Sequence, residues 1–180
     1  MSLLPVRFNT TLTRWMSGVL LATAFGSPVV MAQTTPPAPA DAPPVLRGNT
    51  LDGKVFDLQS LRGKVVMVVF WSTDCAVCRD KMPELRANVK GWAGQPFELV
   101  SVSTDRQRSN AVTYTQLVNA TVPVSQRFIT LWSGEPQYRD SFGPTGHLPA
   151  AFLLDKTGRL VEQYHGRIPP EAWDRIADLL

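Results

Sequence analysis

The stretch WSTDCAVCRD, from Trp71 to Asp80, contains the only two cysteines of the 180-residue chain, Cys75 and Cys78. Two thiols placed three residues apart are compatible with a structural disulfide, a metal clip, half of a zinc site or a reversible redox switch. The segments on either side of this stretch help to decide among the four.

A strand is predicted immediately before the cysteines and a helix immediately after them. The run KVVMVVFWS (64–72) is apolar and β-branched, which is typical of a central strand covered on both faces. A helix is predicted from Ala76 to about Val89, because Met82, Leu85 and Val89 recur at helical spacing. The cysteines therefore lie at a strand-to-helix junction.

This junction suits reversible thiol chemistry. Cys75 lies where the helix begins, and Cys78 follows one turn later on the same face. The unpaired amides and partial positive charge of a helix N-terminus favour a thiolate over a thiol. A Cys75–Cys78 bond closes a small ring and restrains little chain entropy, so it would be a poor staple. The arrangement favours a dithiol that opens and closes.

Further elements indicate the fold class. The order strand, helix, strand, helix, hairpin, helix indicates an α/β fold with a central mixed β-sheet flanked by helices. An N-terminal β-hairpin extension around Asp52-Gly53 is predicted to precede it. The further predicted strands cover 97–105, 150–155 and 159–166; the further predicted helices cover 110–118, a short segment before Phe142 and a segment starting at Pro169.

The N-terminal 44 residues are expected to lie outside the folded domain. Residues 1–32 have the pattern of a signal peptide, with Arg7 and Arg14 ahead of an apolar core and a small residue, Ala32, at the end. An uncleaved N-terminal anchor is the alternative. Residues 33–44 are rich in proline and alanine, which predicts an extended linker. The folded domain is expected to cover 45–180, in an exported, periplasmic protein that is soluble or anchored to the inner membrane.

Charge and composition exclude some partners. The net charge is +3, but from Gln33 onward 16 basic residues face 15 acidic ones. No cluster of basic residues with interleaved aromatic residues is present, so nucleic acid is not an expected partner. A hydrophobic content of 44% is typical of a globular protein with an ordinary core.

The chain resembles the thioredoxin superfamily, and within it the extracytoplasmic TlpA/ResA/DsbE-like thiol–disulfide oxidoreductases. The resemblance covers about 45–180 and implies a thioredoxin-like fold. Its matching residues are Asp52-Gly53, Leu58, Leu61, Gly63-Lys64, Phe70 to Thr73, both cysteines, Arg79, Met82-Pro83, Val102-Ser103, Asp105, Leu148-Pro149, Phe152 to Asp155, Gly158 and Gly166.

The resemblance assigns roles to individual residues. It implies a redox-active disulfide in which Cys75 is the exposed nucleophile and Cys78 the buried resolving thiol. It also implies that Pro149 follows a cis peptide bond beside this disulfide. Leu148 would then offer its backbone groups to a partner chain, and Trp71 is expected to pack on the disulfide.

The function implied by the resemblance is disulfide exchange with client proteins, with the protein acting as a reductant. Apocytochrome c or copper-site proteins are the candidate clients, and a membrane thiol protein is the expected electron donor. The resemblance implies no cofactor and no metal.

Several positions depart from the pattern of the resembling proteins, and Ala76-Val77 lacks the proline that they commonly have between the cysteines. Asp74 stands where they commonly have an aromatic residue, and its carboxylate would oppose a thiolate on Cys75. Lys81 stands where they commonly carry glutamate, and Val69 where thioredoxins keep a buried acid. These departures concern the redox potential and the direction of exchange, not the fold.

The cysteine pair is also compatible with other chemistries. The thiols could bind Cu(I) for copper delivery, with His147 or His165 as a third ligand. Structural zinc is less well supported, because no second close pair of ligands is present. A peroxidase would need a proline and a threonine ahead of its cysteine, where this chain has Val68 and Ser72.

Overall fold

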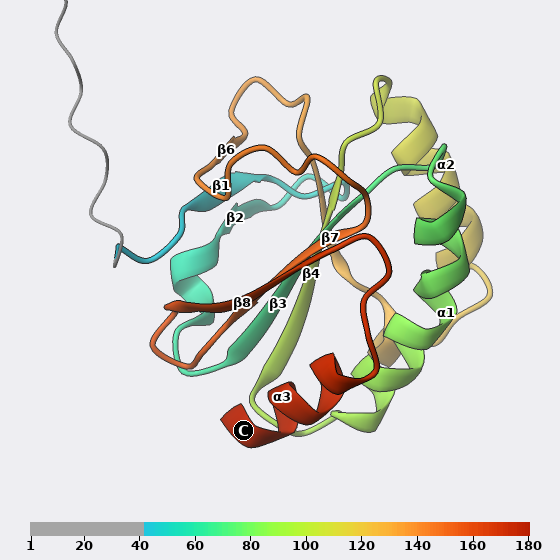
Figure 1. Cartoon of the computed structure of the whole chain (residues 1–180). Coiled ribbons are helices and arrows are strands. Elements are labelled where there is room, and N and C mark those ends of the chain that lie inside the picture. The colour runs from blue at the N-terminus through green and yellow to red at the C-terminus, as the bar shows by residue number, and fades with distance from the viewer. Residues whose placement is uncertain (1–41) are drawn as a thin grey trace, which may run out of the picture. The chain divides into compact units, whose positions relative to one another are not determined.

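A five-stranded mixed sheet forms the centre of the computed structural model, which describes residues 42–180 (Figure 1). The predicted signal peptide and most of the predicted linker lie outside the described residues. The strand order is β5-β4-β3-β7-β8, in which β3, β4 and β5 are parallel and β7 and β8 antiparallel to their neighbours. The strands are β3 (Val65–Trp71), β4 (Phe97–Ser103), β5 (Ile129–Trp132), β7 (Ala150–Leu154) and β8 (Leu160–His165).

Strand β3 lies in the middle of this sheet and is buried on both faces, as its sequence predicts. Because successive side chains of a strand point to opposite faces, β3 contributes to two separate cores. Val65, Met67, Val69 and Trp71 belong to one core, and Val66, Val68 and Phe70 to the other.

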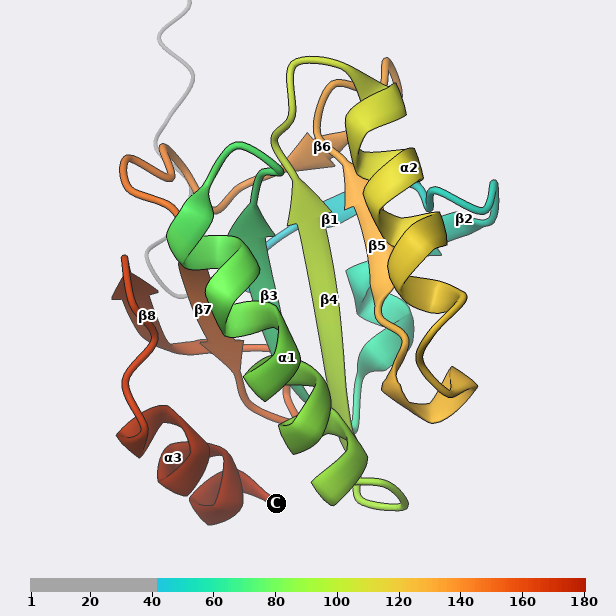
Figure 2. The same ribbon diagram turned by 90° about the vertical axis from the view of Figure 1, so that its right-hand side faces the viewer.

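Three helices cover the face of the sheet that carries Val65, Met67, Val69 and Trp71 (Figure 2). They are α1 (Ala76–Gly91), α2 (Arg108–Asn119) and α3 (Glu171–Leu179). Met82 and Leu85 of α1 pack into the same core as Ala172 and Ile176 of α3. Helix α1 continues through Pro83 rather than ending before it. Within residues 42–180, no helix combines the length and apolarity that a membrane span needs.

A small antiparallel sheet covers the opposite face, and it contains the predicted N-terminal hairpin. Its order is β2-β1-β6, from β1 (Leu46–Asn49), β2 (Val55–Asp57) and β6 (Arg139–Asp140). The hairpin turn contains Gly53 at φ 85°, a left-handed conformation that favours glycine. Phe56 and Leu58, the latter in the 3-10 helix η1 (Leu58–Leu61), fill the core on this side.

Two details of the sequence-based prediction were wrong. The short helix expected before Phe142 is absent from the described residues, where β6 and a loop stand instead. Strand β5 was missing from the predicted order, and a further 3-10 helix, η2 (Val124–Gln126), precedes it. Both β5 and β6 are short, and each is stabilised by pairing with a distant strand, β4 and β1 respectively. Local periodicity carries little information about such segments.

Candidate functional site

Cys75 and Cys78 form a disulfide at the N-terminus of α1, with their Cα atoms 5.2 Å apart. Cys75 is the N-cap residue of the helix, and its Sγ accepts a hydrogen bond from the amide of Cys78 at 3.1 Å. The carbonyl of Cys75 accepts from the amide of Arg79 at 3.1 Å, which closes the first turn. One sulfur thus lies where the helix presents unpaired amides, as the sequence predicts.

The two sulfurs differ in access. The Cys78 residue is 1% exposed and belongs to the core between α1 and the sheet. Cys75 is partly exposed, and the intervening Ala76 and Val77 are exposed. Since thiol–disulfide exchange requires in-line attack on an accessible sulfur, this difference favours Cys75 over Cys78 as the point of external attack.

Trp71 is buried and not on the surface. It is 2% exposed and shares its core with Cys78. Its ring packs against that of Tyr114 in α2, with the centroids 4.9 Å apart. Trp71 therefore belongs to the core on the helix side of the sheet; its packing on the disulfide stays a prediction.

The peptide bond between Leu148 and Pro149 is cis, which confirms the expectation from the resemblance. Antiparallel pairing of Phe70 with Ala150 places Pro149 next to Trp71, at the end of the sheet from which the cysteine loop leaves. The carbonyl of Pro149 accepts a hydrogen bond from Gly166 at 2.8 Å. Outside the helices and strand ladders of residues 42–180, no backbone hydrogen bond involves Leu148.

Asp74 is exposed, and within residues 42–180 it forms no hydrogen bond or ion pair. The next residue is the partly exposed Cys75. Any influence of the Asp74 carboxylate on the Cys75 sulfur therefore acts largely through solvent, where it is screened.

Lys81, one helical turn after Cys78, is a buried lysine. The Lys81 side chain is 7% exposed, and its Nζ lies 2.7 Å from Oε2 of Glu84. The hydrogen bond from Lys81 holds the pKa of Glu84 below its usual value. The other oxygen of Glu84 accepts from Nε1 of Trp173 in α3 at 3.0 Å, so this charge pair also links α1 to α3.

The structure does not bring the histidines to the cysteines as a metal site. In the described part of the chain, no three His, Cys, Asp or Glu side chains are grouped so that they could hold a metal ion. The ring of His165 lies edge-on against Phe152, which belongs to the core on the hairpin side of the sheet. Cys78 belongs to the helix side, and His147 is exposed in the loop before Pro149.

A buried polar cluster beside the cysteine loop was not identified as functional from the sequence. Asp105, 5% exposed, follows β4. Its Oδ1 accepts from the amide and hydroxyl of Thr73, at 2.9 and 2.5 Å. Its Oδ2 accepts from the hydroxyl of Ser103 at 2.7 Å. The signals in the sequence were the polar S-x-D triplet at the end of an apolar strand and the place of Ser103 and Asp105 among the residues that carry the resemblance.

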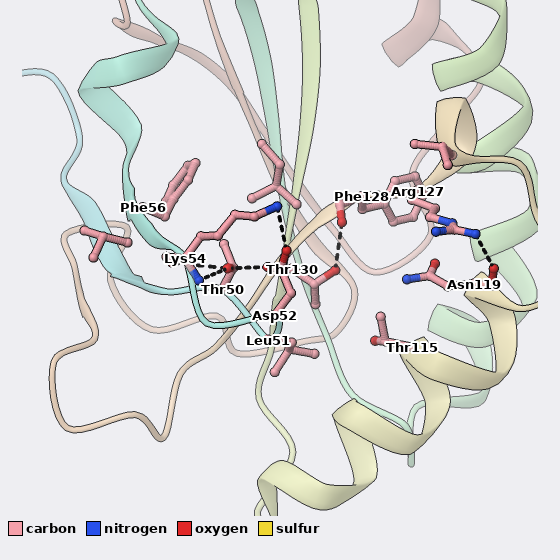
Figure 3. Close-up of a pocket in the computed structure, with 13 residues that line it drawn as sticks. Thr50, Leu51, Asp52, Lys54, Phe56, Thr115, Asn119, Arg127, Phe128 and Thr130 are labelled. Carbon is pink, nitrogen blue, oxygen red and sulfur yellow. Dashed lines mark hydrogen bonds and ion pairs between the residues drawn. The ribbon is translucent and has the colours of Figure 1, made fainter.

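A cavity of about 640 Å³ lies away from this site, between the N-terminal hairpin, α2 and β5 (Figure 3). It is lined by Thr50, Leu51, Asp52, Lys54, Val55, Phe56, Thr115, Asn119, Val124, Arg127, Phe128, Ile129 and Thr130. None of the site residues predicted from the sequence lines it.

The chain matches a known protein family and is similar to proteins named thiol-disulfide oxidoreductases. The family described as AhpC/TSA matches residues 39–172. A thiol-disulfide oxidoreductase ResA of Bacillus thuringiensis is 28% identical over 120 residues, which cover 64% of this chain and 63% of the relative. The ResA of Bacillus subtilis is 26% identical over 127 residues, covering 71% and 66%. The matched part is thus just under two thirds of the length of these relatives.

Solved structures show the same fold. A thiol:disulfide interchange protein of the thioredoxin family from Chlorobium tepidum has a TM-score of 0.59 at 23% identity, covering 77% of this chain and 94% of that one. A thiol-disulfide oxidoreductase structure from Bacteroides vulgatus has a TM-score of 0.61 at 20% identity, covering 78% and 94%. The fold is therefore thioredoxin-like, as the resemblance implied.

Proposed function

Because this chain belongs to the AhpC/TSA family, we propose that it is a thiol–disulfide oxidoreductase in which Cys75 and Cys78 are the catalytic residues. The observation that carries the proposal is the disulfide at the N-terminus of α1, in which Cys75 is partly exposed and Cys78 is buried. The ResA name of the curated relatives supports the same activity. The proposed direction is reduction of client disulfides.

In the reduced protein, the thiolate of Cys75 attacks one sulfur of a client disulfide. The client S–S bond breaks, a mixed disulfide forms, and the second client sulfur leaves as a thiolate that takes a proton from water. The thiolate of Cys78 then attacks Sγ of Cys75 and releases the first client sulfur. Two electrons have passed to the client, and the protein is left with the Cys75–Cys78 disulfide.

Local structure supports each part of this reaction. The amide of Cys78 and the N-terminal end of α1 stabilise negative charge on the Cys75 sulfur before it attacks the client disulfide. The burial of Cys78 restricts it to attack within the mixed disulfide. The unpaired backbone of Leu148, beside Pro149, is available to a client segment in extended conformation.

The cellular context is proposed from the sequence. Residues 1–32 would direct export as a signal peptide or remain as an anchor, 33–44 would be a linker, and 45–180 would work as the catalytic domain in the periplasm. Apocytochrome c or copper-site proteins are the proposed clients, and a membrane thiol protein the proposed donor of electrons.

Trapping with Cys78→Ala tests the proposal. This variant retains the attacking thiol and lacks the resolving one, so it should accumulate mixed disulfides with clients, detected by non-reducing electrophoresis and identified by mass spectrometry. The matched control is Cys75→Ala, which keeps the buried thiol and should trap nothing. Equal trapping by both variants, or wild-type protein that does not reduce insulin disulfides with dithiothreitol as donor, would refute the proposal.

A further inference from the structure

Three consecutive parallel strands are joined at their carboxyl ends by side-chain hydrogen bonds. Thr73 follows β3, Asp105 follows β4 and Trp132 ends β5. Nε1 of Trp132 donates to the carbonyl of Asp105 at 2.7 Å, and the carboxylate of Asp105 accepts from Thr73. We refer to Thr73, Asp105 and Trp132 as the belt.

Asp105 is the centre of the belt, and its surroundings are unusual for a carboxylate. It is buried, and within residues 42–180 no lysine or arginine is paired with it. Its oxygens accept instead from one amide and two hydroxyls, those of Thr73 and Ser103. Burying a carboxylate is costly unless hydrogen bonds compensate. These bonds therefore hold Asp105 and Thr73 together firmly, although the two residues are 32 positions apart in the chain.

Thr73 is also held from the cysteine side. The guanidinium of Arg79, in the first turn of α1, donates to the carbonyl of Thr73. The amide of Cys75 donates to the carbonyl of Ser72 at 3.2 Å. All the polar groups of Thr73 are thus engaged two residues before Cys75, in the segment that determines where the Cys75 sulfur lies.

The far end of the belt depends on a glycine. A Cβ atom added to Gly134 would lie 2.3 Å from the ring of Trp132, so the indole lies directly against the Gly134 backbone. A larger residue at this position would displace the ring that donates to Asp105. The belt therefore extends from Trp132, which packs on the exposed Gly134 after β5, to the loop that carries Cys75.

We propose that Asp105 is a positioning residue of the exchange reaction. Through its hydrogen bonds to Thr73, Asp105 fixes the loop before α1, so that the Cys75 sulfur stays within hydrogen-bond distance of the Cys78 amide. This inference rests on the proposed function only in taking Cys75 as the reactive thiol. When the loop is released, the sulfur leaves the helix N-terminus and its thiolate loses stabilisation.

The test measures the pH dependence of iodoacetamide alkylation at Cys75 in the reduced protein, followed by mass spectrometry. Thr73→Val removes the hydroxyl without changing charge and should shift the alkylation midpoint upward, by about one pH unit or tenfold in rate below the midpoint. The rate at high pH should not change, because accessibility is unaltered. Thr73→Ser keeps the hydroxyl and should restore the wild-type profile. Gly134→Ala should shift the midpoint in the same direction.

Two controls separate positioning from a general loss of stability. Ser101→Ala removes a buried hydroxyl contact of 2.8 Å with Thr130, further back on β4, and should leave the profile unchanged. Gly91→Ala is the control for Gly134→Ala. It adds the same methyl group at a place with nothing within 4 Å, so it should also leave the profile unchanged. A wild-type profile for Thr73→Val, or an equal shift for Ser101→Ala, would overturn the proposal. Wild-type protein that does not reduce insulin would instead refute the exchange function. It would leave the positioning proposal standing, because alkylation of Cys75 needs no client.

Discussion

Two loops meet at the end of the sheet where the disulfide lies, and they are held in very different ways. The loop before α1, residues 72–75, is tied to β4 by the carboxylate of Asp105 and to α1 by Arg79. The loop before β7 ends at the cis peptide bond of Leu148 and Pro149. His147 and Leu148, the two residues before Pro149, form no side-chain hydrogen bonds like those between Thr73 and Asp105 within residues 42–180.

The difference corresponds to two tasks. A sulfur whose reactivity depends on a helix N-terminus has to stay within hydrogen-bond distance of its amides, so the first loop is held by buried polar contacts. A segment that pairs with a client has to keep its amide and carbonyl available, so the backbone of Leu148 is left unpaired in the described residues. In this interpretation, one loop presents the reactive atom and the other accepts the client.

Hydrogen exchange provides the largest expected effect and the most direct way to break the comparison. In the oxidised protein, the amide of Thr73 should exchange more slowly than that of Leu148, by on the order of 100-fold, because only the former is bonded to a buried carboxylate. Amide exchange resolved by NMR measures both. Equal protection of the two amides would show that the second loop is as firmly held as the first.

A smaller effect is expected from Asp74→Asn, which changes a charge on the first loop without removing any of its hydrogen bonds. The loss of a negative charge beside Cys75 should lower the pKa of that thiol, by up to about one unit, since the interaction is screened by solvent. The reduced form is then relatively more stable, and the protein more oxidising. Absorbance titration of the thiolate and equilibration with glutathione measure the two effects.

Cys75 is the N-cap of α1, and Asp74 forms no hydrogen bond within residues 42–180, so the geometry of α1 should be retained in this variant. High salt should reduce the difference between Asp74→Asn and the wild type, because the effect passes through solvent. An unchanged or raised Cys75 pKa would show that the Asp74 carboxylate points away from the sulfur and faces a partner instead.

The smallest effect is expected on the second loop, from His147→Ala. This exposed side chain belongs to no metal-binding group in residues 42–180, so insulin reduction and Cu(I) affinity of the reduced protein should both stay at wild-type values. Competition with a Cu(I) chelator measures the affinity. A large loss would support copper delivery and would give this loop a role in metal binding.

Much of the fold was predictable because its elements carry strong local patterns. The β-branched run of β3 and the apolar spacing of α1 indicate their structures without reference to the rest of the chain, and the turn at Gly53 is similarly local. The missed strand β5 has four residues and the misassigned β6 region has a strand of two. Such short segments adopt extended structure because a distant strand pairs with them, which no window of local sequence contains.

In the candidate site, too, some features follow from local sequence and others only from tertiary contacts. The sequence by itself determined that two thiols lie one helical turn apart at the start of a helix, because strand and helix periodicity place Cys75 and Cys78 there. Only the tertiary structure decided that Asp105 is bonded to Thr73, that Lys81 is buried against Glu84, and that His165 packs on the opposite side of the sheet from Cys78. These contacts depend on strand register and on which face of the sheet each side chain occupies. Both are set by packing between segments far apart in the chain, so the spacing of neighbouring residues does not reveal them.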